Sequence, residues 1–268
     1  MAEEFCEQLA QRGDVAAWGG QHGLCLGVYD HAVCGLSALG HVVWILPAVE
    51  NGRSLRLRSW QSLPMSNDVA YPVFRTPDHD LALRVARRMV AFGAQPYSEV
   101  SVEAGVPTVA EVGRLRDALP DSWFTCWNMD APVVPPPGIP DLTCSAPARE
   151  LPANLADTQA YLPLTVSMLD QPLGSIEDHF AAVIGPHPAE IHWSSLSWPE
   201  APERDLYGES KHAEVTLLLN CDSRELDARA ETHLVLVHVR RHNGDGYRFA
   251  EWLAEQIGQK VIGAPQHS

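Results

Sequence analysis

The sequence predicts an α/β protein of the α+β type, in which mostly antiparallel or mixed sheets carry helices on one side. Three observations support this class: strand-like segments with alternating or β-branched patterns, helix-like segments with apolar residues three and four positions apart, and turn signals between them. The chain has 268 residues and 46% hydrophobic content, enough for one large domain or two modest ones.

The start of the chain is expected to contain a short helix and a hairpin. Residues 2–12 are amphipathic, which favours a helix, and residues 42–46 have the apolar, β-branched composition of a buried strand. A turn signal at 50–53 is followed by alternating leucines and arginines, the pattern of a strand with one solvated face. Together these segments predict a β-hairpin.

The clearest helix signal follows a strand expected at 71–75. Thr76 is the expected N-cap, Pro77 occupies a position where its missing N–H costs nothing, and Gly93 ends the apolar repeat. Further elements expected in this half are a strand at 97–103, a helix opened by a capping box at 108–111, and a strand at 121–129.

The second half of the chain repeats this alternation of strands and helices. A capping box at 175–178 predicts a short helix that stops before Gly185 and Pro186. The remaining expected elements are strands at 189–198, 212–220 and 232–241, a brief helix at 223–230 and a helix at 246–258.

A proline-rich segment, 131–152, predicts a division into two small lobes. Proline fixes φ and cannot donate to a strand ladder, so this segment is expected to be an extended linker between an N-terminal lobe, 1–130, and a C-terminal lobe, 153–268. The alternative is a strap across a single domain. The similar strand–turn–helix patterns at 71–95 and 236–259 allow two interpretations, a duplicated unit or two unrelated βα units.

Charge and cysteine usage restrict the partners and the compartment. The formal net charge of −15 disfavours nucleic acids and anionic membranes, and it suits a basic protein partner or simple solubility. The six cysteines form no CxxC pair, and no secretory signal or 18-residue apolar run is found. We therefore expect a cytoplasmic protein, and the excess of arginine over lysine favours a bacterial origin.

The densest group of ionisable side chains lies between residues 177 and 192. The candidates in it are Asp178, His179, His187, Glu190 and His192. Divalent metals are bound by three or four imidazoles, carboxylates or thiolates that converge on one point. The spacing matches no established metal motif, so histidines on the surface beside a turn are the alternative, and the sequence assigns no metal ligand and no cofactor.

Aromatic side chains supply a second candidate site. Trp193, Trp198 and Tyr207 could line a ligand cleft, with burial in the core as the alternative. Tyr207 and Lys211 have the Tyr-x-x-x-Lys spacing of short-chain dehydrogenases, but no glycine-rich turn follows an N-terminal strand, so a dinucleotide site is rejected. The sequence contains neither a P-loop nor a GxSxG motif.

Two functions follow as hypotheses. The first is a non-catalytic, acidic protein that binds or neutralises a basic partner, in the manner of an immunity protein, because complementary charge speeds association. The second is a small-molecule enzyme with a site between the lobes, either a metal-assisted hydrolase or a transferase. The metal content of the purified protein distinguishes the hydrolase from the binding protein.

Overall fold

The computed structural model describes residues 15–19, 24–29, 32–36, 42–45, 68–127, 135, 138–143, 145–226, 228–240 and 246–267. The chain divides into two compact units, Met1–Gln61 and Ser62–Ser268, and each is described by itself.

The first unit contains a small antiparallel sheet. Its strands pair in sequence order and are β1 (Val15–Gly19), β2 (Leu24–Tyr29), β3 (Ala32–Leu36) and β4 (Val42–Ile45). The strand expected at 42–46 is confirmed as β4. The helix expected at 2–12, and the turn and strand expected after residue 50, lie outside the described residues.

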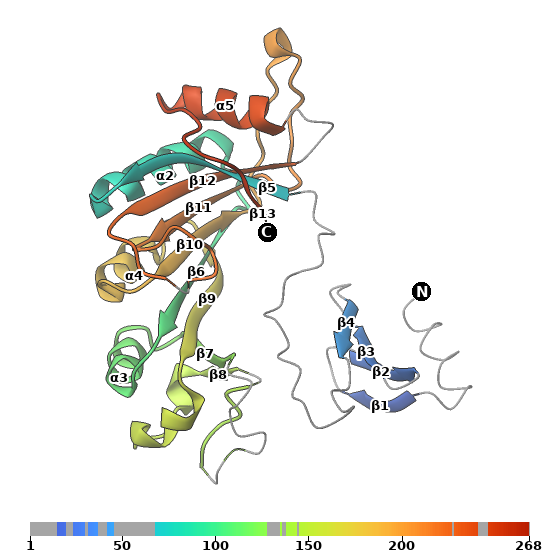
Figure 1. Ribbon diagram of the computed structural model, residues 1–268, viewed down its shortest axis with the longest axis vertical. Helices are drawn as coiled ribbons and strands as arrows, with labels where there is room; N and C mark the ends of the chain where they lie inside the picture. Colours follow the sequence, from blue (N-terminus) through green and yellow to red (C-terminus); the bar gives the residue numbers. More distant parts are fainter. Residues whose placement is uncertain are drawn as a thin grey trace. The chain divides into compact units, whose positions relative to one another are not determined.

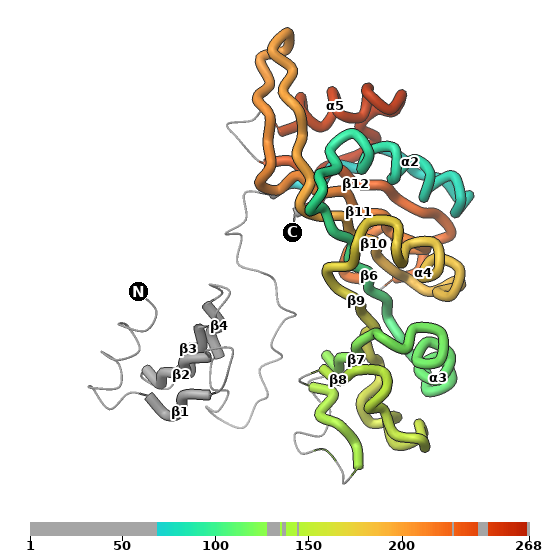
Figure 2. The backbone as a smooth tube through the Cα atoms, turned by 180° about the vertical axis from the view of Figure 1, so that it is seen from behind, coloured from blue at the N-terminus to red at the C-terminus, as the bar shows by residue number. Residues whose placement is uncertain are grey.

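Within the described residues, the second unit is built on one nine-stranded sheet in the order β13-β5-β12-β11-β10-β6-β9-β7-β8, and all its paired strands are antiparallel. The strands are β5 (Asp68–Thr76), β6 (Glu99–Val106), β7 (Trp123–Cys126), β8 (Ala146–Pro147), β9 (Leu164–Pro172), β10 (Ala189–Ser194), β11 (Glu214–Leu219), β12 (His233–Arg240) and β13 (Gln266–His267). The helices are α2 (His79–Gly93), α3 (Val109–Ala118), α4 (Glu177–Ile184) and α5 (Gly246–Gln256). The helices cover one face of the sheet (Figures 1 and 2). The α+β class with helices on one side is therefore confirmed.

Capping side chains define where two of the helices begin. At α2 the N-cap is Asp78, whose carboxylate accepts the Leu81 N–H at 2.8 Å, and the expected cap Thr76 instead accepts the Asp78 N–H. The capping box at α3 is confirmed, because the Thr108 hydroxyl accepts the Glu111 N–H. The predicted start of the helix is therefore two residues too early for α2 and correct for α3.

Two local predictions in the second half are wrong. The segment before α4 forms no Ser175 cap; the buried carboxylate of Glu177 instead accepts the backbone N–H groups of Gly174 and Ile176. The brief helix expected at 223–230 is absent from its described residues, which form the loop between β11 and β12. Both segments use side-chain to backbone hydrogen bonds that sequence periodicity does not reveal.

The expected division into lobes 1–130 and 153–268 is not confirmed. Strands from both sides of the proline-rich segment alternate in one sheet, with β6 paired to both β9 and β10. The end of that segment itself supplies the edge strand β8, which pairs with β7. The duplication is not confirmed either, and the chain divides into its compact units between Gln61 and Ser62.

The main core lies between the sheet and its helices. Side chains on a strand alternate between faces, and β10 shows this directly: Ala189, Ile191 and Trp193 are buried, whereas Glu190, His192 and Ser194 between them are half-buried. We call the face that carries Glu190 and His192 the second face of the sheet.

The second face is partly covered by apolar contacts of its own. A small cluster unites Leu218 of β11 with Leu234 and Leu236 of β12, Ala70 of β5, and Cys221, which follows β11. Leu226 of the β11–β12 loop packs against this cluster. The loop therefore covers one part of the second face, and β11 and β12 are buried on both sides.

Close packing at the end of α2 yields a stability prediction. A Cβ on Gly93 would lie 2.7 Å from Cζ3 of Trp198, whose ring is buried and whose indole N–H donates to the His238 carbonyl at 2.8 Å. Gly93→Ala should lower the free energy of unfolding by at least about 1 kcal/mol, because overpacking outweighs the gain in helix propensity.

Urea denaturation measures this effect, and Gly105→Ala is the matched control. The nearest atom to a Cβ on Gly105 is the Leu226 carbonyl oxygen at 4.0 Å, so this alanine has room and stability should change little. Equal midpoints for the Gly93 variant and the wild type would contradict the packing described at Trp198.

Candidate functional site

Three neighbouring strands bring two histidines and a glutamate together on the second face. His192 lies on β10, Glu214 on β11 and His238 on β12. The register places Glu214 directly opposite His238, and His192 opposite Thr216, two residues further along β11. Directly opposite and diagonal positions on one face are within reach of long side chains, so this register makes the three side chains converge.

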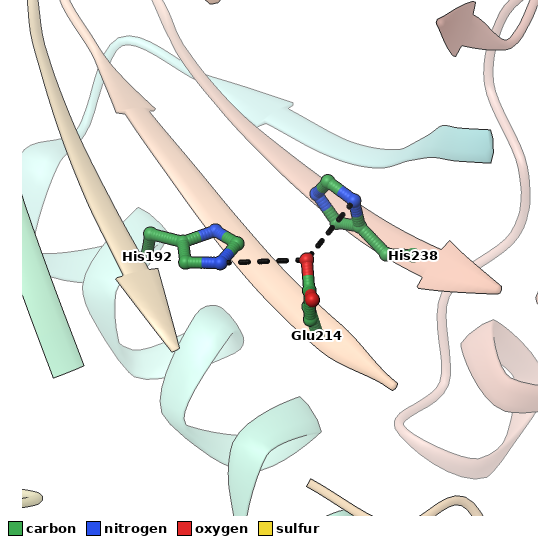
Figure 3. Close-up of side chains that lie close together, drawn as sticks. All are labelled: His192, Glu214 and His238. Carbon is green, nitrogen blue, oxygen red and sulfur yellow. Dashed lines mark ion pairs between the residues drawn. The ribbon is translucent and has the colours of Figure 1, made fainter. Parts of the chain in front are cut away.

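The converging atoms have a spacing suited to a shared ion. Both imidazoles turn a nitrogen toward the carboxylate of Glu214 (Figure 3), with His192 Nε2 at 3.4 Å and His238 Nδ1 at 3.8 Å from Oε2. N–H···O hydrogen bonds are shorter, near 2.7–3.2 Å, as a general rule. Tetrahedral zinc with bonds of about 2.0–2.1 Å would separate its ligand atoms by roughly 3.3–3.4 Å. All three ligand atoms lie within 4.8 Å of one another.

The hydroxyl of Thr216 lies between the two imidazoles, on the side that faces away from Glu214. Its Oγ1 lies 3.0 Å from His192 Nδ1 and 2.9 Å from His238 Nε2, the nitrogens that face away from Glu214. Thr216 and His238 are both fully buried, and the two rings meet edge to face with centroids 5.7 Å apart. The three strands therefore hold the cluster in a rigid setting.

A second group of charges flanks His192. The guanidinium of Arg224, from the β11–β12 loop, contacts both carboxylate oxygens of Glu190 at 3.3 Å. Glu190 Oε1 lies 3.7 Å from His192 Nδ1, and Glu103 of β6 is directly opposite Glu190. Loss of hydration raises the pKa of Glu103, and the negative charge of Glu190 adds to this increase.

The polar group predicted between residues 177 and 192 does not converge in the structure. Glu190 and His192 do share the second face, as expected from their spacing. The other members lie on the helix side: Asp178 pairs with Arg87 of α2, His179 Nε2 contacts the Ala118 carbonyl, and His187 pairs with Glu111 of α3. Each of the three therefore has a structural partner away from His192.

The predicted cleft aromatics also separate. Trp193 and Trp198 are buried in the core, where Trp193 Nε1 donates to Glu177 at 3.0 Å, whereas Tyr207 is exposed in the loop between β10 and β11. Neither tryptophan is among the residues that line the two cavities found on the described surface; each indole N–H instead donates to a buried acceptor, which is the usual arrangement in a core.

Glu214, Thr216 and His238 were missed by sequence reasoning. Their signal was present: Glu214 and Thr216 alternate with Val215 and Leu217 at the start of an apolar strand, and His238 interrupts the apolar run of β12. A polar residue inside a strand buried on both faces requires a partner. That requirement does not tell which strand is the neighbour, so the pairing had to come from the structure.

Comparison with known proteins finds no match: no family model, no curated protein and no solved structure matches the chain. Among the described residues, no helix combines the length and hydropathy needed to cross a bilayer.

The reassignment of Trp193 leads to a prediction. The buried carboxylate of Glu177 accepts hydrogen bonds from Trp193 Nε1 and from the backbone N–H groups of Gly174 and Ile176. Trp193→Phe keeps an aromatic ring but removes one hydrogen-bond donor to a buried carboxyl group, and should destabilise the protein by about 1–3 kcal/mol. Thermal unfolding monitored by circular dichroism measures the change.

Trp123→Phe is the matched control, since Trp123 on β7 is 45% exposed. We expect almost no change in melting temperature for the control. A Trp193 variant as stable as this control would contradict a structural role for the indole N–H.

Proposed function

We propose that this chain binds one divalent transition-metal ion, zinc above all, between His192, Glu214 and His238, and uses it for metal-assisted hydrolysis of a small molecule. The observation that carries the proposal is the separation of 3.4 Å and 3.8 Å between the imidazole nitrogens and Glu214 Oε2. These distances are too long for good hydrogen bonds and close to the edge of a zinc tetrahedron.

The chemistry of the ligand set supports catalysis rather than a closed structural site. Two histidines and one carboxylate are a ligand set of hydrolytic zinc, in which the fourth position is left for water or substrate. An ion bound there would lower the pKa of that water and polarise a substrate carbonyl or phosphoryl oxygen. Residues around the ligands also supply supporting contacts, because Thr216 and Glu190 both lie beside His192 Nδ1, the ring nitrogen that faces away from Glu214.

The three proposed ligands differ in exposure, as expected for a metal site that a substrate can reach from solvent. His238 is fully buried, whereas the side chains of His192 and Glu214 keep 20% and 27% of their surface exposed. The cluster is thus anchored in the sheet on the β12 side and open toward solvent at His192 and Glu214. Cavities of about 330 and 350 Å³ elsewhere on the described surface are lined by residues other than these three.

Elemental analysis tests the proposal. Protein dialysed against zinc and then freed of excess metal should retain about one equivalent, as a single three-ligand site requires. His192→Ala and His238→Ala should each abolish retention. His179→Ala and His187→Ala should retain the metal, because the structure places these histidines on the helix side. Loss of zinc in the His187 variant would instead favour the ligand group predicted from the sequence.

Hydrolysis is tested separately from binding. Zinc-loaded protein should cleave a p-nitrophenyl ester or a bis(p-nitrophenyl) phosphate, and a chelator and Glu214→Gln should each remove this activity. Stoichiometric zinc without any cleavage of either reagent would leave the metal centre in place and remove its hydrolytic role.

The non-catalytic binding protein is the second candidate. It is supported by the net charge of −15 and by the position of the histidine cluster on a sheet face with carboxylates beside it, where a basic protein could dock. This candidate would be favoured over the hydrolase if the protein purifies without metal, binds no added zinc and forms a salt-sensitive complex with a basic protein.

A further inference from the structure

Thr216 occupies a position that no motif indicates and that the metal proposal alone does not explain. It lies on β11, the strand between those of the two histidines, and its hydroxyl oxygen is within 3.0 Å of one nitrogen from each ring. The side chain is fully buried, so water cannot replace this contact easily.

The chemistry of imidazole determines what this contact must do when a metal is bound. A neutral imidazole has one N–H and one lone pair, and a metal takes the lone pair, so the other nitrogen must carry the hydrogen. His192 turns Nε2 toward Glu214 and His238 turns Nδ1 toward it. The N–H groups are then at His192 Nδ1 and His238 Nε2, and both point at the Thr216 oxygen, which has two lone pairs to accept them.

We infer that Thr216 is the positioning residue that fixes the tautomers of both histidines, so that the metal is held by Nε2 of His192 and by Nδ1 of His238. This inference rests on the proposed metal site. The mixed use of the two nitrogen types follows from the sheet: the rings approach one threonine from opposite neighbouring strands, and each offers the remaining nitrogen to the ion.

Glu190 reinforces the same tautomer at His192. Its Oε1 lies 3.7 Å from Nδ1, and its carboxylate is paired with Arg224 through both oxygens. At 3.7 Å Glu190 makes no good hydrogen bond to this nitrogen, but a carboxylate oxygen facing Nδ1 favours an N–H over a lone pair there.

A metal-free protein has a different arrangement open to it. The Thr216 hydroxyl can donate its own hydrogen to one ring nitrogen while it accepts from the other ring. The ring that receives this hydrogen bond then turns its N–H toward Glu214. Metal loading would therefore change the tautomer of one histidine and reverse one hydrogen bond of Thr216, with no change in backbone register.

Substitution of Thr216 tests the inference through metal affinity. Thr216→Val has nearly the same shape but no acceptor, and should weaken zinc binding by about 10–100-fold, the effect expected for loss of such a partner. Thr216→Ser keeps the oxygen and should restore affinity to within a few-fold of the wild type. Affinity is measured by competition with a chromogenic chelator, and folding by circular dichroism.

Thr125→Val is the control for loss of a threonine hydroxyl in this sheet. Thr125 lies on β7 and donates its hydroxyl hydrogen to Ser145, away from the histidine cluster. Its zinc affinity should equal that of the wild type. Equal affinity of the Thr216→Val and wild-type proteins would overturn the inference and leave the metal site standing, whereas a wild-type protein that binds no zinc would overturn both.

A measurement on the wild type decides the question even if the valine variant does not fold. Long-range ¹H–¹⁵N spectra of the zinc-loaded protein distinguish a metal-bound ring nitrogen from an N–H, with assignment by comparison with the His192→Ala and His238→Ala proteins. We expect bound Nε2 at His192 and bound Nδ1 at His238. Binding of both rings through Nε2 would overturn the inference.

Discussion

The antiparallel register of β10, β11 and β12 is the constraint on which the candidate site depends. Side chains alternate between the faces of a sheet, so a shift of one residue in any of these strands would move its polar side chain into the helix-covered core. The observed register instead puts His192, Glu214 and His238 on one face and buries Ile191, Val215 and Val237 on the other. The same pairing that builds the core thus assembles the cluster.

The apolar cluster on the second face determines how far the site is buried. Leu218, Leu234 and Leu236 fill this face beside the histidines, and Leu226 packs over them from the β11–β12 loop. The same loop carries Arg224 to Glu190. The β11–β12 loop therefore covers the apolar part of the second face and also supplies the guanidinium that pairs with Glu190. In this way one loop connects the packing of the second face with the polar residues of the site.

The sequence predicted the local elements better than their assembly. Apolar periodicity predicted the bounds of α3 correctly and those of α2 and α5 closely, because apolar spacing and capping residues are local properties of the sequence. The two-lobe interpretation was not confirmed, because a proline-rich segment looks the same whether it separates domains or ends in the edge strand β8. Of the three proposed ligands, only His192 was among the residues that the local density of ionisable groups singled out, because Glu214 and His238 become its neighbours only through strand pairing between distant segments.

The composition of these strands is itself an argument for a role beyond stability. A histidine at the position of His238, fully buried in a strand of valine and leucine, costs free energy that an apolar side chain of similar volume would not. Thr216, also fully buried, repeats this cost on the neighbouring strand, beside Glu214, whose side chain is 27% exposed. A sheet selected for stability alone would place hydrocarbon at the two buried positions. These three polar groups instead face one another, at the separations of metal ligands and of the hydrogen bonds that support them. The polar residues of these strands are therefore gathered where a bound ion would offset the free energy lost by burying them.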